Sequence, residues 1–210
     1  MLFTSPVFLV FLLVVLLFSR LPLSWSVRKG ILLLASYFFY ASWNPPFVIL
    51  LWVSTLVDYC VALGMARSEK PKRRKALLVV SIVVNLGILG AFKYANFLSQ
   101  SFADIVGLAG GQVSFTTWNV VLPLGISFYT FQTMSYTIDV YRKKLTPTRN
   151  PLDFALYVTF FPQLVAGPIV RASDFLWQLK EPRKATGPQI CWGALLFILG
   201  LFKKAFLADS

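Results

Sequence analysis

The sequence contains no histidine, and its acidic residues are few: 8 Asp and Glu stand against 20 Lys and Arg. The absence of histidine removes the residue that most often serves as a metal ligand and as a general acid or base at neutral pH. Charged residues make up only 13% of the 210 residues, whereas hydrophobic residues make up 57%. This balance is far more apolar than that of a soluble globular domain, so the sequence predicts an integral membrane protein.

Cysteine is also scarce. The two cysteines, Cys60 and Cys191, lie in separate apolar stretches. Two thiols so far apart support neither a disulfide framework nor a thiolate metal site, and we expect both to be small hydrophobic residues of the core. No metal site is predicted.

The basic residues cluster in short segments between apolar runs instead of covering one surface. The densest cluster, within ARSEKPKRRKA, contains Arg67, Lys70, Lys72, Arg73, Arg74 and Lys75. We interpret this charge as contact with an anionic cytoplasmic leaflet rather than with nucleic acid. By the positive-inside rule this connection is cytoplasmic, and counting spans back from it puts the N-terminus outside the inner (cytoplasmic) membrane.

Apolar runs close to the length of a bilayer crossing recur along the chain. A hydrocarbon core of about 30 Å requires about 20 helical residues. We therefore expect residues 1–210 to form a single membrane domain, an all-α polytopic helix bundle. Its helices are predicted at Ser5–Leu21, Gly30–Trp43, Phe47–Met65, Ala76–Phe92, Leu122–Tyr141 and Gln189–Ala208. The segment Ala95–Trp118, which contains several Gly, Ser and Thr, is expected to be an external amphipathic or irregular connection.

The segment Leu152–Val170 is apolar but does not fit a simple crossing. Basic residues flank it on both sides, so a crossing would place one basic group outside. Pro162 and the pair Gly167-Pro168 also interrupt helix geometry. We predict a broken or re-entrant segment that dips in from the cytoplasmic side, which membranes tolerate only where protein or a cavity shelters the backbone.

The helix that starts near Gly125 is unusually polar for a membrane span. Steps of about 100° per residue gather one polar set on one face: Gln132, Ser135, Asp139 and Arg142. A second set lies on nearly the opposite face: Thr130, Thr133 and Thr137. Such a helix cannot face lipid, so we expect it to border protein or a water-filled path. For Asp139 an ordinary ion pair with Arg142 is an equal alternative, and Asp58 is interpreted as a buried hydrogen-bond partner.

Five segments, in order, carry a family resemblance. They are LLLASYFFYASW (32–43), LGAFKYANF (89–97), LPLGISFYTFQTMSYTIDVYRKK (122–144), FFPQLVAGPIVRASDF (160–175) and LFKKAFLAD (201–209). This set resembles the membrane-bound O-acyltransferase family, in its bacterial branch of alginate O-acetylation and teichoic-acid D-alanylation proteins. The resemblance runs the length of the chain and corresponds to the N-terminal portion of that fold.

The resemblance implies an enzyme whose tilted helices surround a central tunnel. A donor such as acetyl-CoA or an acyl carrier is then a substrate loaded from the cytoplasm, and no bound cofactor is implied. An acyl group, usually acetyl, passes to hydroxyls of an extracytoplasmic polysaccharide, with an extracytoplasmic acetyltransferase as a partner. The candidate residues for lining the tunnel or positioning substrate are Gln132, Ser135, Asp139, Gln163 and Arg171.

In that family the catalytic histidine lies in the half that would follow Ser210, so no catalytic residue is carried over. We expect the chain to be incomplete at its C-terminus, inactive alone and completed by a His-containing C-terminal half. Two alternatives stay open. The missing histidine fits a non-catalytic scaffold or relic subunit, and broken helices fit a transporter or flippase, although the two halves show no convincing inverted repeat.

Overall fold

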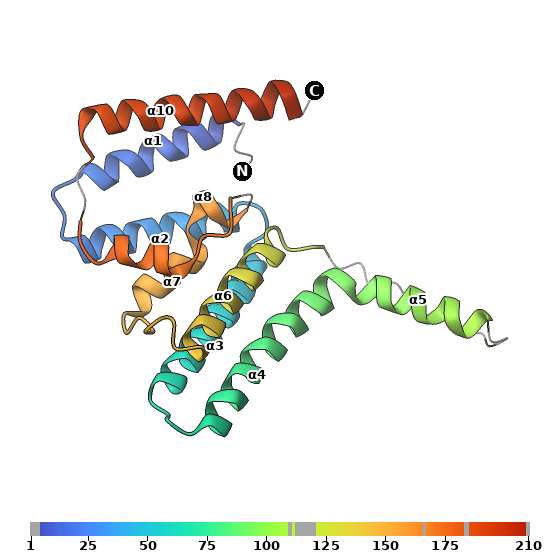
Figure 1. Ribbon diagram of the computed structural model, residues 1–210. Helices are drawn as coiled ribbons and strands as arrows, with labels where there is room; N and C mark the ends of the chain where they lie inside the picture. The colour runs from blue at the N-terminus through green and yellow to red at the C-terminus, as the bar shows by residue number, and fades with distance from the viewer. Residues whose placement is uncertain (1–4, 109–110, 112–120, 166, 183–184, 209–210) are drawn as a thin grey trace.

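The computed structural model describes residues 5–108, 111, 121–165, 167–182 and 185–208, and within them all regular structure is helical (Figure 1). The first half of the chain contains α1 (Pro6–Arg20), α2 (Trp25–Ala41), η1 (Pro45–Phe47), α3 (Val48–Ala66), α4 (Pro71–Leu89), η2 (Gly90–Tyr94) and α5 (Ala95–Leu108). The second half contains α6 (Ile126–Tyr141), α7 (Pro151–Thr159), α8 (Phe161–Leu164), α9 (Ala172–Leu176), η3 (Trp177–Leu179), α10 (Gly187–Phe202) and η4 (Lys203–Ala208). The all-α prediction is confirmed.

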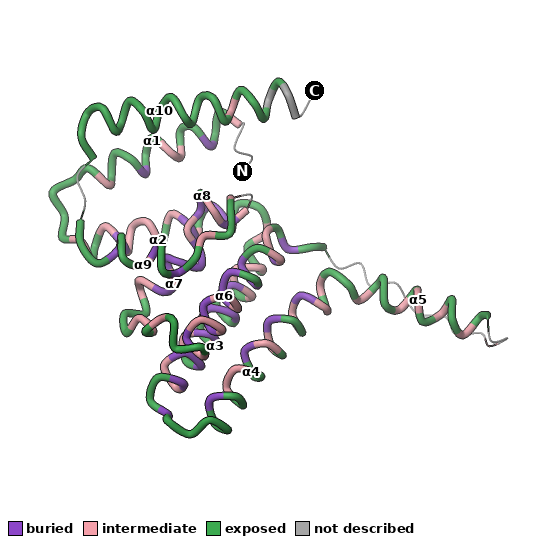
Figure 2. The backbone as a smooth tube through the Cα atoms, in the orientation of Figure 1, coloured by how far each residue is buried: buried purple, intermediate pink, exposed green. Residues whose placement is uncertain are grey.

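The centre of the molecule is the group α3, α4 and α6, each of which packs against the other two. The helices α2 and α7 pack together and against α3, and they extend this core on one side. Figure 2 shows buried residues along α2, α3, α4, α6 and α7, while α5 and α10 contain none. The core is therefore built by residues from both halves of the described chain.

Among the described residues, two helices are long and apolar enough to cross a membrane. One is Pro45–Ala66, with 22 residues, and the other is Pro71–Leu108, with 38 residues. Pro6–Arg20 and Gly187–Phe202 are shorter apolar helices. Large apolar side chains remain exposed on many helices, for example Leu34, Leu56 and Val83. These features are consistent with a membrane protein, because such surfaces are unfavourable in water.

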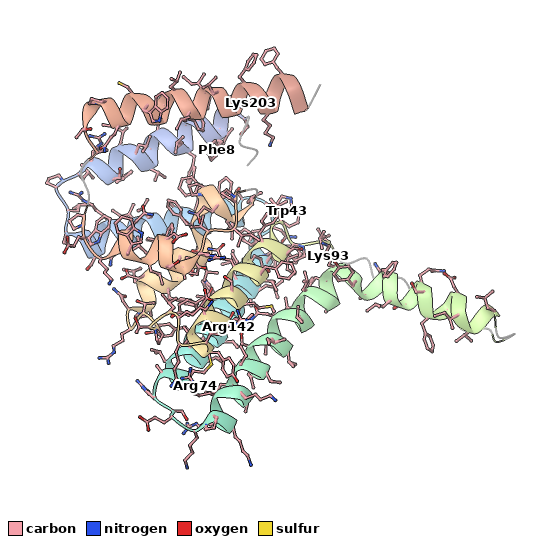
Figure 3. All side chains as sticks on the ribbon, viewed as in Figure 1. Phe8, Trp43, Arg74, Lys93, Arg142 and Lys203 are labelled. Atoms are coloured by element: carbon pink, nitrogen blue, oxygen red, sulfur yellow. The ribbon has the colours of Figure 1, made fainter. Side chains whose placement is uncertain are left out.

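The bundle has two chemically different ends, and Figure 3 labels side chains at both. At the end that we call the basic end, α3 and α6 finish and α4 begins, and exposed cations gather there: Arg67, Lys70, Lys72, Arg73, Lys75, Arg142, Lys143 and Lys144. At the opposite end, α6 begins after Gly125, and Lys93 lies within hydrogen-bond distance of Ser127.

Arg74 ties the helices together at the basic end. The residue is 9% exposed, and its guanidinium donates to the carbonyl of Met65 in α3, at 2.5 Å, and to those of Val140 and Tyr141 in α6, at 3.0 and 2.9 Å. The last carbonyls of a helix have no partner within it, so a cation there supplies both hydrogen bonds and a favourable charge. One residue of the basic cluster is thus a structural cap.

Several boundaries differ from the sequence predictions. The helix predicted at Gly30 begins at Trp25, because Lys29 finds an acidic partner and can be buried in the first turn. The helix predicted at Ala76 begins at Pro71, since Arg74 is satisfied by carbonyl oxygens. Part of the predicted connection Ala95–Trp118 is helical, as α5 continues α4 through the π-helix η2, whereas 109–110 and 112–120 lie outside the described residues.

The prediction for the cysteines was wrong. Both Cys60 and Cys191 are exposed and free, on α3 and α10. Their apolar neighbours in sequence indicated burial, but those neighbours are themselves exposed on the outer faces of these helices, for example Leu56 and Trp192. In a bundle of this composition an apolar stretch does not by itself indicate a core position.

The break predicted within Leu152–Val170 is present, whereas a re-entrant path through the membrane stays a prediction. Helix α7 stops at Thr159, α8 covers only Phe161–Leu164, and no regular helix follows until α9. A Cβ added to Gly125, whose φ is +72°, would lie 2.3 Å from the carbonyl oxygen of Leu164, so α8 lies against the start of α6. The chain then returns, and Arg171 lies beside residues of the basic end.

Candidate functional site

A network of buried polar side chains lies between α6 and the helices α3 and α4, and we call it the polar seam. Its members are Ser54 and Asp58 of α3, Ser81 and Asn85 of α4, and Thr133 and Thr137 of α6. The Asp58 carboxylate accepts from Ser81 at 2.5 Å and from the Asn85 amide at 2.8 and 3.0 Å. Ser54 donates to the amide oxygen of Asn85 at 2.7 Å. Asp58 is therefore the buried hydrogen-bond partner that the sequence indicated.

The seam joins all three central helices. Thr137 lies 3.1 Å from the Ser81 hydroxyl, and Thr133 donates to the Asn85 amide oxygen at 3.4 Å. Buried polar groups are costly unless they are paired, and here each helix supplies partners for another. Thr133 and Thr137 of α6 thus hold the three central helices together.

The polar seam does not continue to the Gly125 end. Thr130, one turn before Thr133, has a buried hydroxyl without a hydrogen-bond partner among the described residues. The amide oxygen of Gln163 on α8 is likewise buried without such a partner. Arg28 Nε and the hydroxyls of Thr55 and Tyr129 share this property. Since buried polar atoms are nearly always paired with protein or water, these positions are suited to bound water.

On its other flank, α6 faces the broken segment, and Gln132 binds that segment directly. Its amide donates to the backbone carbonyl of Tyr157 in α7 at 2.8 Å, and the residue is 3% exposed. The Tyr157 hydroxyl lies 3.3 Å from the carbonyl oxygens of Gln132 and Val170. Gln132 therefore anchors backbone that a broken helix leaves unpaired.

A polar cavity of about 370 Å³, the basic pocket, opens at the end of this flank. Its walls come from the last turns of α6, the connection after it and the start of α9: Ser135, Ile138, Asp139, Arg142, Lys144, Leu145, Arg171 and Ser173. Three of these side chains are cationic and one is anionic. A cavity with that balance, open to water, favours an anionic group with several hydrogen-bond acceptors, such as a phosphate.

The five candidate residues from the sequence separate into two groups. Ser135, Asp139 and Arg171 meet in the basic pocket. Gln132 and Gln163 do not line it, since Gln132 is occupied by Tyr157 and Gln163 is on α8 toward the Gly125 end. The alternative, an ion pair between Asp139 and Arg142, does not form. Among the described residues, the salt bridge that is present joins Lys29 to Asp153.

Sequence reasoning missed Ser173 and Lys144 as pocket residues. The basic residues after α6, Lys144 among them, were used only to predict the membrane topology. Nothing in the sequence around Ser173 indicated a binding residue. Its proximity to Arg171 in a segment already predicted to return to the basic end was the one available indication.

The sequence relatives of the chain are bacterial O-acetyltransferases. A probable alginate O-acetylase of Pseudomonas aeruginosa is 39% identical over 211 residues, which cover 100% of this chain and 40% of the relative. The probable alginate O-acetylase of Azotobacter vinelandii is 40% identical over 212 residues, covering 100% of this chain and 42% of that protein. A peptidoglycan O-acetyltransferase of Helicobacter pylori is 35% identical, covering 85% of this chain and 38% of the relative.

The chain thus spans about 40% of the length of the curated relatives it matches. No family model matches it, and no solved structure matches it. The relatives nevertheless agree with the family that the sequence resembles. The chain corresponds to the N-terminal portion of the membrane-bound O-acyltransferases that include the bacterial alginate O-acetylases.

Proposed function

We propose that the chain forms the donor-side pocket and part of the tunnel wall of a membrane O-acyltransferase. The enzyme would move an acetyl group from a cytoplasmic donor to hydroxyls of an extracytoplasmic polysaccharide. The names of the relatives support acetyl as the group and alginate or peptidoglycan as the class of acceptor. The residues of this chain would bind and position the substrates. The catalytic base would come from a His-containing portion outside it, because its 210 residues contain no histidine.

One observation carries this proposal: the broken segment returns to the basic end and places Arg171 and Ser173 opposite Asp139 in the basic pocket. A guanidinium presents several N–H donors in a fixed plane, which suits the oxygens of a phosphate. The anionic part of a donor such as acetyl-CoA, or the phosphate that links an acyl carrier to its arm, would occupy this pocket.

The membrane orientation follows from charge. The cations that gather at the basic end put that end in the cytoplasm by the positive-inside rule, with the N-terminus of α1 outside. The non-helical backbone between α8 and α9 requires hydrogen-bond partners at membrane depth, and the Tyr157 hydroxyl of α7 supplies one to the carbonyl of Val170. The unpaired polar atoms of Thr130 and Gln163 support a polar route toward the outer face.

The pocket is tested by binding of coenzyme A to the purified chain in lipid nanodiscs. Arg171→Met is expected to weaken binding about tenfold, since a charged hydrogen bond contributes roughly 1.5–3 kcal/mol. Arg73→Met removes the same charge from an exposed site at the same end outside the pocket and should change the affinity little. Equal losses in both variants would mean that binding is general attraction to the basic end, and the pocket assignment would fall.

The alternatives make different predictions in the same experiment. If the donor is an acyl carrier, the chain binds a phosphopantetheinylated carrier and Arg171→Met weakens that complex, while free coenzyme A binds poorly. If the chain is a scaffold, neither probe binds. Capture of a second membrane polypeptide that contains the missing histidine would then separate an assembling subunit from a relic.

A further inference from the structure

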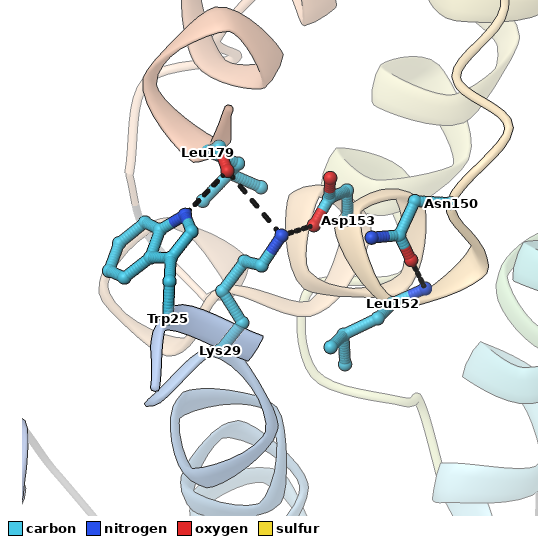
Figure 4. A network of polar contacts seen from close by, with 6 residues as sticks. All are labelled: Trp25, Lys29, Asn150, Leu152, Asp153 and Leu179. Atoms are coloured by element: carbon cyan, nitrogen blue, oxygen red, sulfur yellow. Dashed lines mark hydrogen bonds and ion pairs between the residues drawn. The ribbon is translucent and has the colours of Figure 1, made fainter. Parts of the chain in front are cut away.

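The return segment, residues 170–179, is held at both of its ends by side chains from elsewhere. At the first end the Tyr157 hydroxyl lies 3.3 Å from the carbonyl oxygen of Val170. At the second end the carbonyl of Leu179 accepts from the indole N–H of Trp25 at 2.7 Å and from the Lys29 ammonium at 3.4 Å (Figure 4). Between them Phe175 packs its ring 5.8 Å from that of Tyr157. Arg171 and Ser173, the pocket residues of this segment, lie between these attachments.

Lys29 joins the second attachment to the other end of the broken segment. Its ammonium pairs with Asp153 at 2.5 Å, and the two side chains are only 6% and 14% exposed. Asp153 lies in the first turn of α7, whose N-terminus is capped by the Asn150 side chain. The buried Lys29 ammonium therefore binds both the start of the broken segment, at Asp153, and the end of the return segment, at Leu179.

The chemistry of this position favours a cation. A buried ion pair is costly unless further hydrogen bonds satisfy it, and the Leu179 carbonyl is such an additional acceptor. Removing the ammonium would leave the Asp153 carboxylate without its charged partner and Leu179 with the indole N–H alone. Because a buried charge is strongly unfavourable without a partner, the two segments would be expected to separate so that water can reach Asp153.

We propose that Lys29, together with Trp25 and Asp153, is a positioning residue that sets where the return segment lies and thereby holds Arg171 and Ser173 in the basic pocket. Lys29 does not line that pocket and would not touch the donor. The importance of this role for donor binding rests on the proposed function, whereas the placement of the return segment does not.

The test measures the distance between two pocket walls in nanodiscs. Spin labels are attached to Ser173→Cys on the return segment and Lys144→Cys beyond α6, in a chain with Cys60→Ala and Cys191→Ala. Dipolar broadening is expected in this parent chain and with Lys29→Arg, and is expected to be lost with Lys29→Met and with Asp153→Asn. The double exchange of Lys29→Asp with Asp153→Lys should restore it. Lys180→Met, a loss of the same charge at an exposed neighbouring position, should leave it unchanged.

Unchanged broadening in Lys29→Met would overturn the proposal. If Lys29→Met fails to fold, Trp25→Phe is the variant that decides, because it removes the indole N–H that binds Leu179 and keeps an aromatic ring. Broadening equal to that of the parent would then overturn the proposal. Coenzyme A affinity is measured on the same substitutions without labels and is expected to fall about tenfold with Lys29→Met, the same loss that is expected with Arg171→Met. If Lys29→Met loses the broadening but the parent chain binds no coenzyme A, the proposed function is wrong and the positioning role of Lys29 is supported.

Discussion

The two flanks of α6 have similar numbers of polar residues in the sequence but do different things in the structure. On the flank toward α3 and α4, Thr133 and Thr137 meet side chains of the polar seam, and every bond stays within the protein. On the flank toward the broken segment, Gln132 holds backbone and Asp139 opens into a water-accessible pocket. Polarity in a membrane helix therefore indicates an interior position, and only the neighbouring segment decides between helix association and a binding site.

The largest expected effect is on the sealed flank. Asn85→Ala removes both amide donors from the buried Asp58 carboxylate and the acceptor of Ser54. We expect a loss of about 3 kcal/mol in the free energy of unfolding, because the buried Asp58 carboxylate keeps only the hydrogen bond from Ser81. Denaturation in mixed detergent micelles, followed by tryptophan fluorescence, measures this.

Ser135→Ala is the matched control on the pocket flank. Its hydroxyl donates to the backbone carbonyl of Gln132 and borders the half-open pocket, so stability should change by less than about 1 kcal/mol. Similar losses for the two variants would remove the distinction between a sealed flank and an open one.

The second effect concerns the contact between α6 and the broken segment. Gly125→Ala would place a Cβ 2.3 Å from the Leu164 carbonyl oxygen at a residue with φ of +72°. We expect a destabilisation of about 2 kcal/mol, since a left-handed residue with a side chain is strained and the neighbouring backbone must move. The same unfolding assay reports it.

Gly30→Ala serves as the comparison, because an added Cβ at Gly30 meets nothing within 4 Å and the residue lies inside α2. Replacement of a helical glycine by alanine should leave stability equal or raise it by up to about 1 kcal/mol. If Gly125→Ala behaved like Gly30→Ala, α8 would not lie against the start of α6.

The smallest expected effect is on the pocket itself. Asp139→Asn removes the one anionic side chain from walls that hold three cations. Binding of coenzyme A should become about fivefold tighter, since a unit charge a few ångströms away near water contributes roughly 1 kcal/mol. Isothermal titration in nanodiscs measures it, and the gain should shrink at high salt. Weaker binding instead would assign Asp139 a direct contact with a donor N–H or hydroxyl group.

Much of the fold could be predicted from periodicity and breakers. Pro162 and the basic flanks of Leu152–Val170 were sufficient for the break and the return, because both reflect local backbone chemistry and charge placement. The start of α2 could not be predicted in this way. A lysine beside an apolar run, such as Lys29, indicates the end of the helix unless a partner for its charge is known. That partner, Asp153, is far away in the sequence.

The candidate site was predicted only in part for a related reason. Helical geometry correctly grouped Gln132 with Asp139, yet the pocket closes against Arg171 and Ser173, while Gln132 is covered by Tyr157. Which residue on a shared face stays open depends on how far α7 extends along α6. That length is set by tertiary packing, which a helical projection does not contain.

The central claim is that the chain enters and leaves the broken segment at one end of the bundle, and cysteine labelling tests it most directly. In a chain with Cys60→Ala and Cys191→Ala, single cysteines are placed at the exposed positions Lys72, Ser173 and Gln100 and treated with a membrane-impermeant maleimide. The account predicts that Lys72→Cys and Ser173→Cys react only when the cytoplasmic face is opened, whereas Gln100→Cys reacts in intact cells. Reaction of Ser173→Cys in intact cells, on the side opposite to Lys72→Cys, would contradict it.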